Sequence, residues 1–126
     1  RLGEERIGQM LPLLLEAVRR HELHVLWCCD PMHGNTLTTS NGVKTRDFNQ
    51  ILSELRQCFE IHRSHNTWLG GVHFELTGED VTECTGGVQG LLETDLSTNY
   101  ETYCDPRLNY VQSLEMAFLI AGSRGG

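Results

Sequence analysis

Three side chains that can ligate a divalent metal, His33, Glu75 and Asp105, lie at or just past the ends of short predicted strands. If these strands are parallel, their carboxyl ends meet at one edge of the sheet, where α/β proteins build their active sites. Imidazole and carboxylate ligands together suit Mn, Fe, Co or Zn. The positions therefore indicate a metal site. The alternative is that Glu75 and Asp105 form ordinary ion pairs with Arg46 and Arg107 at the rim of the sheet.

Three helices are expected to carry these strands. Apolar residues recur at the spacing of amphipathic helices in three segments: residues 4–21, 47–65 and 109–121. Asp47 with Gln50, and Asn109 with Gln112, each place a capping residue three positions before a side chain that can complete a capping box. These pairs predict where the second and third helices begin.

Three short stretches have strand character: residues 24–29, 72–76 and 100–105. Alternation in the second stretch, VHFEL, turns His73 and Glu75 to the same face, so we expect His73 to lie deeper in the interior than the ligands. Residues 30–46 and 77–99 are predicted to be loops. Alternating strands and helices indicate a parallel sheet wrapped by helices, either doubly wound or closed as a barrel.

The composition limits the class of protein. The 126 residues suffice for one small domain, and 17 acidic against 10 basic residues give a net charge of −7. This balance argues against a nucleic-acid surface, which needs clustered Lys and Arg. No apolar run approaches the roughly 20 residues that span a bilayer, and no targeting segment is visible. Because the first residue is Arg1 and a helical pattern begins almost at once, we expect a piece of a longer chain.

The cysteines do not form a recognisable disulfide or zinc pattern. There are five of them, without CxxC spacing. This usage indicates a reducing compartment. Each cysteine is expected to be a small buried apolar side chain, most clearly Cys58, which lies on the apolar stripe of the second helix.

Four stretches resemble the C-terminal half of class II, plant-type 3-deoxy-D-arabino-heptulosonate 7-phosphate (DAHP) synthases: WCCDPMHGNT (27–36), VKTR (43–46), GGVHFELTGEDVTECTGG (70–87) and YETYCDPRLNYVQSLEMAFLIA (100–121). The resemblance covers essentially the whole chain. It implies that residues 1–126 are the C-terminal part of one catalytic domain, a (β/α)8 TIM barrel whose N-terminal part is absent. The implied reaction is the aldol-type condensation of phosphoenolpyruvate with erythrose 4-phosphate and water, the first step of the shikimate pathway.

The resemblance also assigns the catalytic metal ligands to His33, Glu75 and Asp105. It implies a divalent metal, Mn²⁺ or Co²⁺ foremost, that polarises the aldehyde oxygen of the tetrose so that C3 of phosphoenolpyruvate can attack it. Water then adds at C2, and phosphate leaves by C–O cleavage. The family's fourth ligand is a cysteine near the first barrel strand, and no residue of this chain matches it.

Basic residues are implied to hold the two phosphorylated substrates. Arg1, in the sequence RLG, matches an arginine that contacts phosphoenolpyruvate, and its planar fork suits two anionic oxygens; a frayed terminal residue is the alternative. Lys44 and Arg46 are candidates for the tetrose phosphate, with a solvated loop pair as the alternative. In GEDVTEC, Asp80 and Glu83 are hypothesised to orient ligands or activate water.

Two departures from the family pattern concern local packing: TWLGG (67–71) stands where THPGG is usual, and the cysteine is doubled at 28 and 29. A complete enzyme of this kind is expected to be a cytoplasmic homo-oligomer, or plastidic in a plant, without nucleic-acid or membrane partners. The other functional hypothesis is a non-catalytic fragment that only binds metal. A different metal aldolase on the same barrel is not excluded by the spacing.

Overall fold

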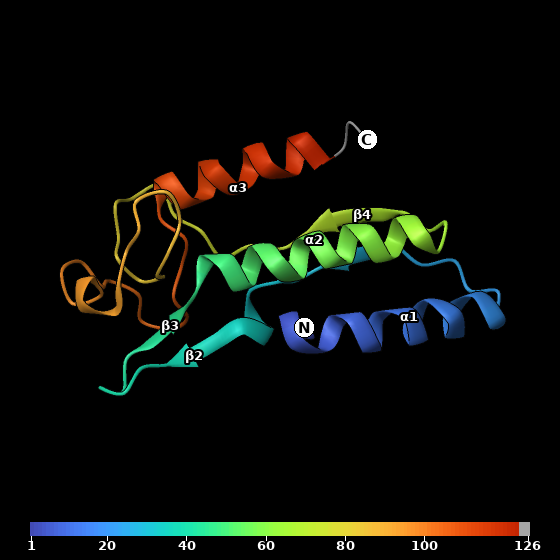
Figure 1. The fold of residues 1–126 in the computed structure, drawn as a ribbon, viewed down its shortest axis with the longest axis horizontal. Helices are drawn as coiled ribbons and strands as arrows, with labels where there is room; N and C mark the ends of the chain where they lie inside the picture. The colour runs from blue at the N-terminus through green and yellow to red at the C-terminus, as the bar shows by residue number, and fades with distance from the viewer. Residues whose placement is uncertain (124–126) are drawn as a thin grey trace.

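The computed structural model describes residues 1–123 and has the α/β composition expected (Figure 1). In chain order its elements are α1 (Glu4–Arg20), β1 (Trp27–Cys29), β2 (Thr36–Thr38), β3 (Lys44–Arg46), α2 (Phe48–Ser64), β4 (Leu69–Val72) and α3 (Tyr110–Ser123). Single turns of 3₁₀-helix cover His33–Asn35 and Glu93–Asp95. Within the described residues, no helix has the length and apolar content needed to cross a membrane.

The three predicted helices are confirmed, and so are their starting points. Asp47 caps α2 by accepting hydrogen bonds from the backbone N–H groups of Asn49 and Gln50. Asn109 and Gln112 cap α3 reciprocally, since each side-chain oxygen accepts a hydrogen bond from the other residue's backbone N–H. Local sequence decided these boundaries because a cap depends on contacts within four residues.

The first two predicted strands do pair in parallel, but the second lies earlier in the chain than predicted. β4 pairs with β1 through Trp27–Leu69 and Cys29–Val72, so it occupies residues 69–72 rather than 72–76. Gly70, which reads as a turn residue in the sequence, is inside this strand. A Cβ atom at Gly70 would collide with the Leu26 side chain. Leu26 lies just before β1 and its side chain is exposed, so that side chain can move to make room.

The third predicted strand, residues 100–105, is wrong. That segment forms bends, and the parallel pairing is a single bridge between Leu76 and Leu108. The Leu108 backbone N–H donates to the Glu75 carbonyl over 3.0 Å, and the Thr77 N–H donates to the Leu108 carbonyl over 3.0 Å. Asp105 therefore lies in the loop that leads into this bridge. The predicted loop 30–46 also differs, because it contains the antiparallel pair β2–β3.

The chemistry-bearing segments gather at one end of the molecule. Helix α2 packs against α1 and contacts α3, and the arrow of β4 points toward the hairpin β2–β3 and the long loop between β4 and α3 (Figure 1). The buried apolar side chains form one continuous cluster, which includes Met32, Phe48, Ile51, Leu55 and Leu108. Because β1 and β4 are parallel, the segments that follow them emerge at this same end.

Cysteine burial follows the prediction at three of the five positions. Cys29, Cys58 and Cys84 are buried, whereas Cys28 and Cys104 are exposed. All five are free thiols. Burial raises the pKa of the Cys84 thiol to about 12, as expected for a cysteine that serves as core.

Candidate metal centre

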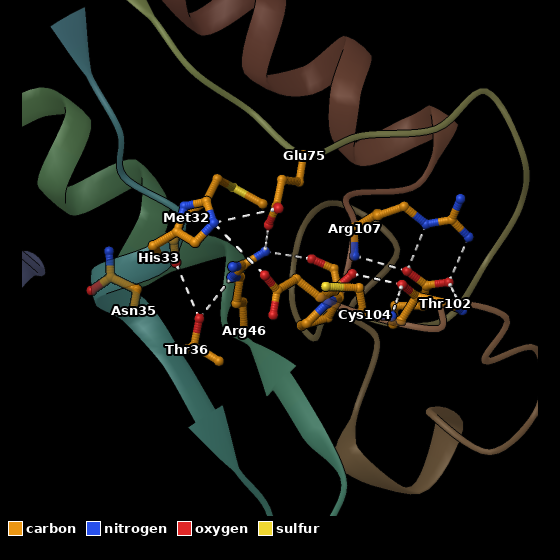
Figure 2. Close-up of polar contacts among 12 residues, drawn as sticks. Met32, His33, Asn35, Thr36, Arg46, Glu75, Thr102, Cys104 and Arg107 are labelled. Atoms are coloured by element: carbon orange, nitrogen blue, oxygen red, sulfur yellow. Dashed lines mark hydrogen bonds and ion pairs between the residues drawn. The ribbon is translucent and has the colours of Figure 1, made fainter. Parts of the chain in front are cut away.

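The structure brings His33, Glu75 and Asp105 together at the end of the molecule where β1 and β4 terminate, and Figure 2 shows how His33 and Glu75 face one another. One potential ligand atom from each lies within 4.8 Å of the others. His33 Nε2 is 3.4 Å from Glu75 Oε1 and 3.7 Å from Asp105 Oδ2. All three side chains are partly buried. Nitrogen and carboxylate atoms at this spacing can share one divalent ion at the usual bond lengths of about 2.0–2.2 Å.

Asp30 holds the His33 ring from the side opposite the carboxylates. Its carboxylate lies 2.8 Å from His33 Nδ1 and also accepts the backbone N–H groups of Met32 and His33. Burial alone would raise the pKa of Asp30, but these His33 and Met32 contacts hold it at about 2. An ionised carboxylate only accepts hydrogen bonds, so Nδ1 carries the proton. The other ring nitrogen, Nε2, then faces the two carboxylates.

Each carboxylate has one oxygen held by a cation and one turned toward His33. Glu75 Oε2 accepts a hydrogen bond from Arg46 Nη1, and Asp105 Oδ1 accepts one from Lys44 Nζ. The alternative considered from the sequence, an ordinary ion pair, is thus present between Glu75 and Arg46. Asp105 pairs with Lys44 instead of Arg107.

The other oxygen of each carboxylate, Glu75 Oε1 or Asp105 Oδ2, is placed to bind the same cation as His33 Nε2. A lone pair and two anionic oxygens facing one another repel unless a cation or a proton lies between them. Three such ligands leave coordination positions open for substrate, which is typical of catalytic rather than structural metal sites. Within residues 1–123, no cysteine joins this group.

The three predicted substrate-binding cations lie around the same site with different exposure. The Arg1 side chain is 66% exposed, and its Nε donates to Asp30 Oδ2 over 3.0 Å. Lys44 is 47% exposed at the rim. Arg46 is fully buried, donates to Glu75 and to the Pro106 carbonyl, and has an Nη2 group without a hydrogen-bond partner.

His73 does not lie in the interior as predicted. Its side chain is exposed, and its ring stacks on that of His33 with the centroids 5.9 Å apart. The prediction assumed that His73 lies within a strand with regular alternation. In the structure His73 follows β4, although its backbone N–H still donates to the Cys29 carbonyl over 2.8 Å.

Glu54 is a site-building residue that the sequence analysis missed. It is 1% exposed, and its carboxylate accepts hydrogen bonds from the Gly3 N–H over 3.1 Å and the Asn35 amide over 2.7 Å. Burial raises the pKa of this carboxyl, against the effect of these donors. Glu54 thereby ties residues 1–3 to the His33 turn. The sequence feature that could have identified Glu54 is its place on the buried stripe of α2, between Ile51 and Leu55, where an acidic residue is unusual.

Gly34→Ala is expected to destabilise the contact between residues 1–3 and the His33 turn, which Glu54 connects. A Cβ atom at Gly34 would lie against Gly3 N, 2.8 Å from Gly3 Cα and 2.9 Å from the Leu2 carbonyl carbon, all of them backbone atoms. We expect a loss of about 1–3 kcal/mol in the free energy of unfolding, measured by urea denaturation. Gly78→Ala is the matched control, since a Cβ there meets nothing within 4 Å. Equal urea midpoints for both variants would contradict the expectation.

Comparison with known proteins shows the family of the chain. The sequence model of the class-II DAHP synthetase family matches residues 1–121. The chain is 53% identical over 123 residues to a phospho-2-dehydro-3-deoxyheptonate aldolase of Neurospora crassa, covering 96% of this chain and 26% of that protein.

Two bacterial relatives give the same result. The aldolase AroG of Mycolicibacterium smegmatis and the aldolase of Streptomyces coelicolor are each 50% identical over 121 residues, which cover 96% of this chain and 26% and 27% of those proteins. The chain thus spans about a quarter of the length of the curated relatives it matches. Because the family match extends over nearly every residue, the chain belongs to the class-II DAHP synthetase family.

Proposed function

We propose that this chain supplies the metal-binding and part of the substrate-binding surface of a DAHP synthase, which condenses phosphoenolpyruvate with erythrose 4-phosphate. The observation that carries the proposal is the convergence of His33 Nε2 with one oxygen each of Glu75 and Asp105. Family membership supplies the reaction. A divalent ion held by these three residues, Mn²⁺ or Co²⁺, would supply a Lewis acid for the aldehyde of the tetrose.

The chain's own residues prepare the site for that ion and for two anionic substrates. Asp30 fixes the His33 ring, and Arg46 holds one oxygen of Glu75, so both ligands are oriented before metal binds. We assign the phosphoenolpyruvate contact to Arg1, which lies at the rim beside Asp30. We assign the tetrose phosphate to Lys44, which is exposed next to Asp105, with Arg46 behind it.

The proposed architecture of the whole enzyme is a (β/α)8 barrel, of which this chain forms the C-terminal half. The parallel pairing of β1 with β4 and the parallel bridge from Leu76 to Leu108 support it, because a barrel of this kind is built from parallel neighbours. The helices α1 and α2 pack beside one another, as consecutive outer helices of a barrel do. We expect the complete enzyme to be a homo-oligomer.

The function can be tested in a chimeric enzyme, made by replacing the matching segment of the Neurospora crassa relative with this chain. We expect consumption of phosphoenolpyruvate that needs erythrose 4-phosphate, stops with a chelator and returns with Mn²⁺. A folded chimera that binds Mn²⁺ through His33 but does not turn over would favour the alternative, a metal-binding segment without catalysis. The unaltered Neurospora crassa protein is the control for the assay.

A further inference from the structure

A fully buried carboxylate, Glu83, organises the loop that carries Asp105. Its Oε1 accepts the backbone N–H groups of Glu101, over 3.2 Å, and Thr102, over 2.9 Å. Its Oε2 accepts the backbone N–H of Arg107 over 2.8 Å. One carboxylate thus holds both ends of the segment 101–107, and Asp105 lies between the two ends.

Arg107 completes this arrangement with its side chain. Its Nη2 donates to Glu83 Oε1 over 2.8 Å, and its Nε donates to Glu83 Oε2 over 3.0 Å. A guanidinium with two parallel N–H donors matches a carboxylate in a single geometry. Burial alone would raise the pKa of the Glu83 carboxyl, but Arg107 and the backbone donors hold it below its usual range. Glu83 and Arg107 therefore form an ion pair at neutral pH, and segment 101–107 is folded around that pair.

Three further hydrogen bonds connect the neighbourhood of Glu83 to the metal site. Within the loop, the Thr102 hydroxyl donates to the Asp105 carbonyl over 2.9 Å and accepts the Cys104 N–H over 3.2 Å. The Glu83 carbonyl accepts the hydroxyl of Thr45, in β3 between Lys44 and Arg46, over 2.8 Å. Glu83 thereby links the loop that bears one candidate ligand to the strand that bears both site cations.

We propose that the Glu83–Arg107 ion pair is a positioning device that holds Asp105 at metal-binding distance from His33 and Glu75. This inference rests on the proposed function, and it deepens that function by assigning a role to two residues outside the ligand set. Glu83 acts through the loop, because its carboxylate is fully buried and saturated by five donors. For the same reason it does not activate water, one of the two roles considered from the sequence.

The test measures Mn²⁺ binding to the metal-stripped chimeric enzyme by calorimetry, with the folded fraction of each variant checked by circular dichroism. Glu83→Gln keeps the size of the side chain but places an amide N–H group against the donors of the loop. We expect Mn²⁺ affinity to fall by about 10-fold or more. Glu79→Gln is the matched control: it removes the same charge from an exposed side chain of the same segment and is expected to leave affinity unchanged.

Two further variants test the same role of the ion pair if Glu83→Gln does not fold. Arg107→Lys keeps the charge but loses the paired donors, and Thr102→Val removes the hydroxyl contact to the Asp105 carbonyl; each is expected to lower Mn²⁺ affinity several-fold. Folded variants with reduced stability but unaltered Mn²⁺ affinity would overturn the proposal and leave the proposed function intact. Failure of the unsubstituted chimera to bind Mn²⁺ through His33 would instead overturn the proposed function, and this inference with it.

Discussion

His33→Ala in the chimeric enzyme is expected to abolish Mn²⁺ binding and to lower kcat by about 1000-fold or more. The substitution removes the proposed nitrogen ligand, and the carboxylates of Glu75 and Asp105 remain facing the position that Nε2 occupied. A Lewis acid contributes several kcal/mol to transition-state stabilisation, and each 1.4 kcal/mol corresponds to about tenfold in rate. Steady-state kinetics with calorimetry of Mn²⁺ binding measures both effects.

Lys44→Ala is the informative contrast, because it changes the same site without removing a ligand. Lys44 contributes one point charge beside Asp105 and is half exposed. We expect the KM for erythrose 4-phosphate to rise about 10- to 100-fold, with a much smaller change in kcat. Equal losses of kcat in the two variants, with KM values unchanged, would show that the assigned roles are wrong.

The helices were predictable because their signals are local. Apolar spacing and the caps at Asp47 and Asn109 depend on residues within one or two turns, and the structure has the helices at those positions. The hairpin β2–β3 was missed although its turn contains Asn41-Gly42, a sequence that favours tight hairpin turns, and Gly42 has a positive φ of 80°. Each of its strands has only three residues, too few to show alternation.

The strand errors have a different cause. Whether residues 69–72 or 72–76 form the strand is decided by the pairing with β1, Trp27 with Leu69 and Cys29 with Val72, which local sequence does not encode. The same tertiary effect leaves residues 100–105 irregular, because backbone donors of that loop are satisfied by the carboxylate of Glu83 rather than by a neighbouring strand.

The grouping of the three candidate ligands could be predicted, and the residues that hold them could not. Strand polarity placed His33, Glu75 and Asp105 at one edge, and the structure groups them despite the errors in the strand positions. His33 still follows β1, and Glu75 and Asp105 precede the two residues of the Leu76–Leu108 bridge. The roles of Asp30 on the His33 ring and of Glu54 under the turn depend on side-chain directions between distant segments. Sequence spacing carries no information about those directions.

The 126-residue chain alone is expected not to catalyse the condensation. Its β1–β4 sheet has two strands, so each strand keeps an unpaired edge within the described residues. Arg1, at the rim of the site, is 66% exposed, and within the described residues no cysteine joins His33, Glu75 and Asp105. Large apolar side chains such as Leu26, Trp68 and Phe118 are 72–77% exposed, and we therefore expect the purified chain to associate.

Complementation tests this expectation directly. The purified chain is assayed for metal-dependent consumption of phosphoenolpyruvate, by itself and after co-expression with the remaining three quarters of the Neurospora crassa relative. We expect activity only in the second case, because the added part would pair the free edges of β1 and β4 and supply the fourth metal ligand that the family resemblance implies. A chain carrying His33→Ala should assemble equally well, measured by size-exclusion chromatography, without restoring activity. A rate for the chain alone close to that of the chimeric enzyme would refute the expectation, since open edges and a solvent-exposed site would then be compatible with full turnover.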